Sequence, residues 1–408
     1  MDFTPTEEQE AARELAGRIF GDLATHDRLR AAGTGTDAEL WKALCAAGLP
    51  GAVEDTGLLG LVLLLEEQGR VTAQVPFAAT CVYGILAVTR HGTREQRARL
   101  LPGLRDGTTV VTGALPAPDT VTSRATRDSQ DTRDSRDSRD TPATPATRDD
   151  AAHGEAGGVV ASGGGRLTGV VEWVPWLRDA THVLVPDEEH ALWLVRTEDA
   201  AAVEAVELTA PWSAGRLVLA GTPAERLGGA VARTGAGRAG PAGQSGPTGE
   251  RLGGPGAAAY ADVLAAARIA FAGLQAGVCA GSLARAVAYT SVREQFGRPL
   301  ATHQAVQLRA ADAHMDTEAI RVTTYEAAWR FDEGLDAGAA ALTAAWWASE
   351  AGKRVVHAGQ HLHGGMGADL DHPVHRHFLW GRQLDAYLGC GTELLAELGD
   401  LLAEGDPS

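Results

Sequence analysis

The sequence is poor in cysteine and has no long apolar run. Its 408 residues include four scattered cysteines (Cys45, Cys81, Cys279 and Cys390) and no Cys-x-x-Cys pair. This usage favours reduced thiols over a disulfide framework or a zinc site. No uninterrupted apolar run reaches about 18 residues, so no membrane span is expected. The N-terminal stretch MDFTPTEEQEAARELAG is acidic and amphipathic, unlike a signal peptide. These absences predict a soluble, cytoplasmic protein.

Positive charge is also scarce. The chain carries 36 Lys and Arg against 53 Asp and Glu, a formal net charge of −17. This balance argues against nucleic acid or an anionic membrane surface as a main partner. An anionic ligand would therefore need a local basic pocket, to which Arg293 and Arg298 can contribute.

The pattern along the chain predicts a mainly α fold with a small β domain. Thr6 caps a first helix with apolar positions at Ala11, Leu15, Ile19 and Leu23. Short segments rich in β-branched residues, such as RLTGVVEWV and THVLVP, indicate strands. Long Ala-rich segments near the C-terminus then indicate four packed helices. We expect an N-terminal helical domain over 1–112, a β-barrel-like domain over 113–227, a Gly/Ala/Pro-rich linker over 228–256 and a helical bundle over 257–408.

A low-complexity insertion interrupts the expected β domain at about 119–158. Its centre is a degenerate Arg-Asp-Ser repeat with almost no apolar residues. Nothing in the repeat can offset the entropy of ordering it, so disorder is expected. A nucleic-acid-binding tail is the alternative, but each Arg is neutralised by a neighbouring Asp.

The most informative stretch is RAVAYTSVREQFGRPLATHQAVQ, residues 285–307. It begins as a helix, breaks at Phe296-Gly297-Arg298-Pro299 and resumes helical apolar spacing at Val306. Such a break exposes backbone N–H groups at the start of the second helix, and Arg293 lies about one turn before it. Fixed positive charge beside free backbone donors can bind a diphosphate. A plain helical corner with a solvated Arg is the alternative.

Two motifs carry a resemblance to a known family. The Arg-x-x-Phe-Gly…Gln motif of REQFGRPLATHQ and the Gln-x-x-x-Gly-Gly-x-Gly motif of QHLHGGMG resemble the acyl-CoA dehydrogenase family and occur in its order. HGTREQRARLLPGL also resembles the family's segment before its β domain. The resemblance implies an FAD flavoprotein, usually a dimer or tetramer, that oxidises the Cα–Cβ bond of an acyl-CoA thioester.

The resemblance also assigns cofactor positions. It implies that Arg293 reaches the FAD diphosphate of a neighbouring subunit and that Trp173 packs against the flavin ring. Without the resemblance, Trp173 would be a strand core residue and Gly364-Gly365 an ordinary turn. The positions implied to line the cofactor are Arg293, Phe296, Gln304, Gln360, Gly364, Gly365 and Trp173.

The general base of the family has no counterpart. Removal of the α-proton suits a shielded carboxylate, because burial raises its pKa toward neutrality. One family position for this glutamate is Leu388 here, and a small shift offers only Gly389 or Cys390. The other position precedes Arg268 and is Ala267. The flavin-facing segment departs too: Pro175 replaces a threonine, and the stretch 115–118 replaces Thr-Glu-Pro.

Three interpretations remain. In the first, this chain is the base-lacking subunit of a hetero-oligomer, as in the actinobacterial-type heteromers that HLHGGMGADLDHPVHRHFLWGRQ resembles, and a related chain supplies the glutamate. In the second, a homo-oligomer uses another base. In the third, the chain is a non-catalytic scaffold, or Cys390 acts as a nucleophile. No metal is expected, because the spacing of the C-terminal His residues fits no helical HxxxH pair. The weak base candidates are Asp385, Asp262, His361, His363 and His375, the last three lying near Asp369 and Asp371.

Overall fold

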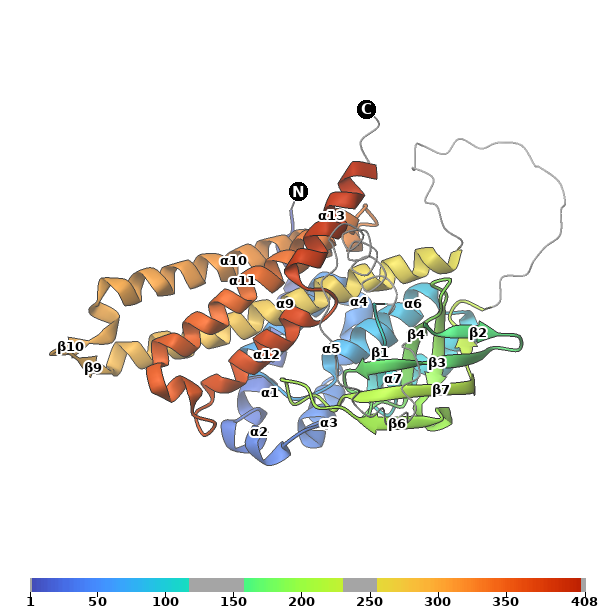
Figure 1. Ribbon diagram of the computed structural model, residues 1–408, viewed down its shortest axis with the longest axis horizontal. Coiled ribbons are helices and arrows are strands. Elements are labelled where there is room, and N and C mark those ends of the chain that lie inside the picture. Colours follow the sequence, from blue (N-terminus) through green and yellow to red (C-terminus); the bar gives the residue numbers. More distant parts are fainter. Residues whose placement is uncertain (1, 117–157, 230–254, 405–408) are drawn as a thin grey trace, which may run out of the picture.

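The structure is a computed structural model that describes residues 2–116, 158–229 and 255–404. The repeat of the predicted insertion at 119–158 and most of the predicted linker at 228–256 lie outside these residues. Three parts follow one another along the chain: helices, two small sheets and a second set of helices (Figure 1). The predicted mainly α fold with a small β domain is confirmed.

The N-terminal part is helical from its first turn. Thr6 forms a capping box with Gln9, each side chain accepting a hydrogen bond from the other residue's backbone N–H. Pro50 lies in the first turn of the helix that follows Gly48, where its missing N–H has no cost. The helices are α1 (Glu7–Leu23), α2 (His26–Ala32), α3 (Ala38–Ala46), α4 (Leu49–Val71), α5 (Phe77–Ala79), the π-helix η1 (Thr80–Leu86), α6 (Ala87–His91) and α7 (Arg94–Asp106).

The middle part holds two four-stranded sheets with a shared apolar core. The first has the order β1-β4-β5-β8 and the second the order β2-β3-β7-β6. Among the described strands of these two sheets, β1 and β4 are the one parallel pair. The described strands form two open sheets around this core. The predicted small β domain is present, and these sheets do not close into a barrel. The strands are β1 (Val111–Gly113), β2 (Val160–Ser162), β3 (Arg166–Val174), β4 (His182–Pro186), β5 (Leu192–Arg196), β6 (Ala202–Ala205), β7 (Gly215–Pro223) and β8 (Glu225–Arg226).

The C-terminal part is built around α9, a 38-residue helix that packs against α4, α10, α11 and α12. Its 256–292 segment is long and apolar enough to cross a membrane, but 89% of its most apolar window is buried inside the protein, as in a central bundle helix. The elements are α9 (Pro255–Val292), β9 (Glu294–Gln295), β10 (Arg298–Pro299), the 3-10 helix η3 (Leu300–Thr302), α10 (Gln304–Asp332), α11 (Gly338–His363), the 3-10 helix η4 (Gly364–Ala368), α12 (Val374–Ala386) and α13 (Gly391–Glu404).

A break at Tyr387–Cys390 separates α12 from α13. Leu388 adopts φ 66° and Gly389 φ 110°, so the chain leaves α12 through two residues in left-handed conformations. A bulky residue rarely adopts positive φ, and the conformation persists because the surroundings hold it. The Leu388 side chain is 3% exposed and packs in the main core.

His377 on α12 makes folding sensitive to pH. Its ring is 1% exposed, and its Nε2 atom donates a hydrogen bond to the Arg70 carbonyl oxygen at 3.0 Å. Burial, helped by the charge of Arg285, lowers the pKa of His377 to about 4 from the ordinary 6.5. Between pH 6.5 and pH 4 the His377 ring is protonated in the unfolded chain but neutral in the folded chain. The free energy of unfolding therefore falls as the pH falls.

We therefore expect the His377 contribution to be complete above about pH 6.5 and to fall by about 3 kcal/mol as pH drops to about 4. Urea unfolding at a series of pH values in this window measures the loss. In His377→Gln the amide still donates to the Arg70 carbonyl but does not titrate. An equal pH dependence in wild type and variant would contradict the assignment.

Candidate functional site

A hairpin at one end of the C-terminal bundle carries the first group of predicted cofactor residues. Phe296 and Gly297 have φ 56° and 77°, the two positive values that a tight two-residue hairpin turn requires. The turn joins β9 to β10, and the Leu300 N–H donates to the Arg293 carbonyl at 2.8 Å. Phe296 is 89% exposed and touches one other ring, that of His303. The hairpin therefore projects into solvent (Figure 1).

The glycine turn predicted as a second cofactor element lies at the same end. Tyr289 on α9 stacks on His363, the last residue of α11, with ring centroids 4.9 Å apart. This contact places η4 beside the start of the hairpin. Gly364 has φ 62°, and a Cβ atom added at Gly364 or Gly365 would meet nothing within 4 Å. The turn thus offers bare backbone for a close approach.

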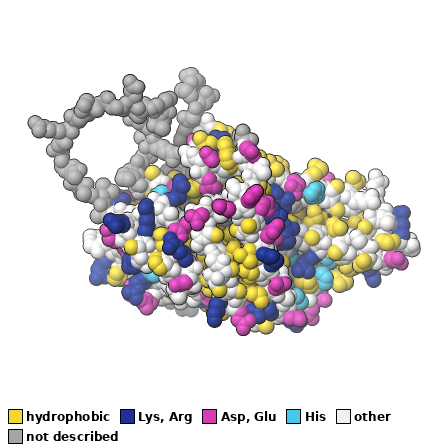
Figure 2. Space-filling model, turned by 180° about the vertical axis from the view of Figure 1, so that it is seen from behind, with side chains coloured by type: hydrophobic (Ala, Val, Ile, Leu, Met, Phe, Trp, Pro, Cys, Tyr) yellow, Lys and Arg dark blue, Asp and Glu magenta, His cyan; other side chains and the backbone are white. Residues whose placement is uncertain are grey.

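Free positive charge accompanies these groups. Arg293 is exposed and has no ion-pair partner among residues 2–116, 158–229 and 255–404, while the Arg298 guanidinium lies 3.3 Å from His303 Nδ1. Gln304, the first residue of α10, is also exposed, and Gln360 donates to the Gly367 carbonyl at 3.1 Å. Figure 2 shows hydrophobic and uncharged side chains over most of this end of the bundle, with a few charged ones at its extremity. We call this end the tip, defined by residues 293–304 and 364–367.

Trp173 does not join the tip. It lies on β3, and its ring packs against Tyr387 with centroids 5.7 Å apart. Tyr387 in turn contacts Phe271 of α9 at 4.7 Å. Phe271 precedes Arg293 by 22 residues, which at 1.5 Å per helical residue is about 33 Å. One chain therefore holds the two groups of predicted cofactor residues at separate places.

Around Trp173, aromatic side chains fill the junction between the three parts of the chain. The Tyr83 and Tyr387 hydroxyl oxygens lie 2.7 Å apart and form a buried hydrogen bond. Trp212 stacks on Trp176 and contacts both Trp380 and Tyr387 edge-on. Burial raises the pKa of both tyrosines, so both hydroxyls stay neutral. The aromatic cluster is Tyr83, Trp173, Trp176, Trp212, Phe271, Trp380 and Tyr387.

Neither expected position for the general base can accept a proton. Leu388 is 3% exposed and Ala267 is fully buried, and both side chains are aliphatic. Arg268, next to Ala267, is 8% exposed and makes a bidentate ion pair with Glu397 of α13, both N–O distances being 2.7 Å. The family arginine position is thus occupied by a structural ion pair.

Both weak aspartate candidates are already engaged. Asp385 accepts from Ser349 Oγ at 2.5 Å and pairs with Arg382 at 3.0 Å. Asp262 pairs with Arg90 at 2.9 Å and with His91 at 2.7 Å. Burial alone would raise the pKa of Asp262, but the hydrogen bonds with these partners lower it overall. A carboxylate stabilised in its charged form is a poor proton acceptor.

The histidine candidates have structural contacts of their own. His363 Nδ1 lies 2.7 Å from the Gly359 carbonyl and His375 Nδ1 lies 2.6 Å from the His372 carbonyl, while His361 is exposed. No group of three or more His, Cys, Asp or Glu able to hold a metal occurs in the described part of the chain. Cys390 Sγ lies 3.3 Å from the Thr392 hydroxyl.

Comparisons with known proteins agree with this architecture. Two family models match: "Acyl-CoA dehydrogenase, N-terminal domain" over residues 6–108 and "Acyl-CoA dehydrogenase, C-terminal domain" over residues 254–396. Acyl-CoA dehydrogenase FadE27 of Mycobacterium tuberculosis is 31% identical over 99% of both chains. Acyl-CoA dehydrogenase FadE28 of the same organism is 26% identical over 98% of both.

Two solved structures are also similar over nearly the whole chain. A variant of the Tcur3481-Tcur3483 steroid ACAD is 37% identical, with a TM-score of 0.78, covering 98% of this chain and 99% of that one. The ChsE4-ChsE5 complex from Mycobacterium tuberculosis contains a chain that is 29% identical, with a TM-score of 0.79 and full coverage of both.

Proposed function

Because this chain belongs to the acyl-CoA dehydrogenase family of FAD-dependent oxidoreductases, we propose that it is the base-lacking subunit of a hetero-oligomeric acyl-CoA dehydrogenase. A related chain supplies the glutamate that removes the α-proton of an acyl-CoA thioester. This chain supplies residues that hold part of the FAD. The assembly acts in the cytoplasm.

The observation that carries the proposal is the absence of a carboxylate at both base positions, Leu388 and Ala267. The residues packed around Leu388 also support the proposal. Tyr387, next to Leu388, is 5% exposed and packed among Trp173, Trp212 and Phe271. Tyr387 contacts the ring of Trp173, which is half-buried. A second, unlike chain is therefore needed for the chemistry.

The tip supports a role toward a cofactor held mainly by the partner. Arg293 can neutralise a diphosphate, and the bare backbone at Gly364-Gly365 can approach the adenosine side. The aromatic cluster that includes Trp173 meets α9 at Phe271, about 33 Å along that helix from Arg293, whereas only the short ribityl chain separates the flavin ring from the diphosphate. Tip and junction therefore cannot serve the same FAD molecule from one chain. When bound, FAD supplies the hydride acceptor, and this chain orients and neutralises its phosphate end.

Two of the similar structures are themselves named as pairs of chains, Tcur3481-Tcur3483 and ChsE4-ChsE5. This naming favours the hetero-oligomer over a homo-oligomer with another base. Asp385 and Asp262, the alternative bases, are both held in ion pairs. We accordingly assign the cofactor-binding role to Arg293, Phe296, Gln304, Gln360, Gly364 and Gly365, and a residual packing role to Trp173.

The test is the flavin content of the purified protein. Expressed alone, the chain is expected to be colourless; co-expressed with a related chain that keeps the glutamate, it is expected to co-purify with it and be yellow. The absorbance near the flavin maximum, divided by the protein concentration, gives the number of FAD molecules per chain. Yellow protein with one FAD per chain after expression alone would favour the homo-oligomer, and colourless protein under both conditions would favour a scaffold.

A further inference from the structure

Three rings lie in contact behind the tip. Tyr289 stacks on His363, and His363 also contacts His372, with ring centroids 5.0 Å apart. His363 is the last residue of α11 and is 3% exposed, while His372 is half-buried and lies just before α12. We call Tyr289, His363 and His372 the ring stack. It connects the C-terminal ends of α9 and α11 with the start of α12.

The ring stack closes a loop that contains the glycine turn. Residues 364–371 are exposed at every position but one. His363 precedes this loop and His372 follows it, so the contact between their rings holds the two ends of the loop together. Tyr289 lies one helical turn before Arg293, whose N–H donates to the Tyr289 carbonyl oxygen at 2.9 Å. The ring stack therefore fixes the position of the glycine turn relative to Arg293.

One hydrogen bond of the ring stack requires a neutral His372. Its Nδ1 atom accepts from the N–H of Val374, the first residue of α12, at 3.3 Å. An imidazole nitrogen accepts a hydrogen bond only while it carries no proton. Protonation of His372 therefore removes this bond and places a positive charge at the N-terminus of a helix, where positive charge is unfavourable. It also brings that charge against the ring of His363.

The surroundings of His372 keep its ring neutral at pH 7. Burial is the main reason why the pKa of His372 lies below the ordinary 6.5. The groups that face the ring and lower its pKa further are His363 of α11, Arg285 of α9 and His26 of α2. Asp369 of the loop acts in the opposite direction. The ring therefore becomes charged only in acid.

We propose that the ring stack positions the glycine turn against Arg293 for flavin binding, and that protonation of His372 opens the stack and weakens this binding. The inference rests on the proposed function, in which the tip holds the phosphate end of FAD. Tyr289, His363 and His372 are then positioning residues, which act through the turn. A positive ring near a diphosphate would by itself strengthen binding, because opposite charges attract. Weaker flavin binding in acid is therefore the mark of a positioning role.

The first test needs no flavin. Hydrogen–deuterium exchange of the full chain is followed by mass spectrometry on peptides that cover residues 364–373. Tyr289→Ala should make these amides exchange about tenfold faster, because the lost aromatic contact no longer protects the loop. Tyr289→Phe keeps the ring and should exchange like wild type. Equal exchange in Tyr289→Ala and wild type would overturn the inference.

The second test is the FAD affinity of the co-expressed assembly, stripped of flavin and titrated with FAD from pH 7.5 to pH 5. At pH 7.5, Tyr289→Ala should bind FAD about tenfold more weakly and Tyr289→Phe like wild type. Below pH 6.5 the wild-type affinity should fall, by at most about tenfold for each pH unit, the limit for one proton. Unchanged affinity in Tyr289→Ala, or tighter binding in acid, would contradict the positioning role.

Two histidine variants identify the group that titrates. In His372→Asn the amide oxygen can accept from the Val374 N–H, as in an Asx turn, but it does not titrate, so the affinity should lose its pH dependence. His377→Gln should keep the wild-type pH dependence of FAD binding, which separates the ring stack from the effect of His377 on folding. The same pH dependence in His372→Asn and wild type would overturn the assignment.

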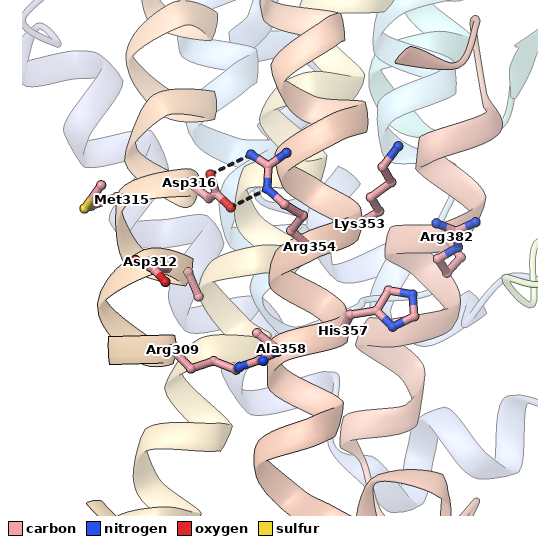
Figure 3. Close-up of a pocket in the computed structure, with 10 residues that line it drawn as sticks. Arg309, Asp312, Met315, Asp316, Lys353, Arg354, His357, Ala358 and Arg382 are labelled. Carbon is pink, nitrogen blue, oxygen red and sulfur yellow. Dashed lines mark hydrogen bonds and ion pairs between the residues drawn. The ribbon is translucent and has the colours of Figure 1, made fainter. Parts of the chain in front are cut away.

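Arg354→Ala and Tyr325→Ala are matched controls within the bundle. Arg354 lines a groove of about 710 Å³ and forms a bidentate ion pair with Asp316 of α10, with N–O distances of 2.7 and 2.9 Å (Figure 3). Tyr325 is half-buried like Tyr289 but follows Gln304 by 21 residues, about 31 Å along α10. Both variants should bind FAD like wild type. A wild-type assembly that holds no FAD at any pH would refute the proposed function, while the exchange test still decides whether the ring stack positions the turn.

Discussion

Arg293→Ala is expected to cause the assembly to lose its bound flavin. Arg293 is exposed at the tip with no ion-pair partner in the described residues, so its charge is available to a diphosphate. Charge-assisted, forked contacts to phosphate are among the strongest that a side chain makes. We expect flavin to bind about a hundredfold more weakly, enough for gel filtration to remove it. The absorbance ratio of flavin to protein after gel filtration measures the loss.

Two further variants define the cause. Arg293→Lys keeps the charge without the planar fork and should retain an intermediate amount of flavin. Arg94→Ala removes an exposed arginine of α7, far from the tip in the sequence, and should retain all of it. Equal flavin retention in Arg293→Ala and Arg94→Ala would refute the assignment of the tip to the diphosphate.

Leu388→Glu is expected to destabilise the chain without making it a dehydrogenase. The side chain at this position is 3% exposed and lies in the main core, next to Tyr387 of the aromatic cluster. An uncompensated buried charge costs about 3–5 kcal/mol, partly relieved if the group stays protonated. Urea unfolding measures the loss.

Leu388→Met is the matched control, because it keeps the volume and polarity of the site and should cost less than about 1.5 kcal/mol. No acyl-CoA oxidation is expected from Leu388→Glu alone, since position 388 is buried next to Tyr387, which itself packs against Trp173, Trp212 and Phe271. A gain of activity in the isolated variant would show that a flavin and a substrate fit beside this residue, and would favour the homo-oligomeric alternative.

Local sequence signals were sufficient for most helices and for the tip. Thr6 as an N-cap predicts the start of α1, and Phe296-Gly297-Arg298-Pro299 predicts the break, because both depend on a few neighbouring residues. The two cofactor motifs lie 67 residues apart, from Arg293 to Gln360, yet helices α10 and α11 return the chain to the same end. Their proximity is visible in the Tyr289–His363 contact.

The aromatic cluster could not be predicted from the sequence. Tyr83, Trp212 and Phe271 come from three separate parts of the chain, and each has the sequence surroundings of an ordinary core residue. Only the tertiary arrangement shows that they meet at Tyr387. The left-handed conformation of Leu388 was equally hidden, because the sequence around it continues a helical pattern. The engagement of Asp262 by Arg90 and His91 likewise joins residues about 170 positions apart.

In the proposed assembly, this chain contributes no base to the reaction. The most direct measurement uses the co-expressed assembly, with the glutamate of the related chain replaced by glutamine and this chain left unchanged. Exchange of the α-proton of an acyl-CoA with deuterium oxide is then followed by mass spectrometry. The account predicts that exchange and dehydrogenation are both lost while flavin content stays the same. Exchange at an undiminished rate would place a base in this chain and contradict it.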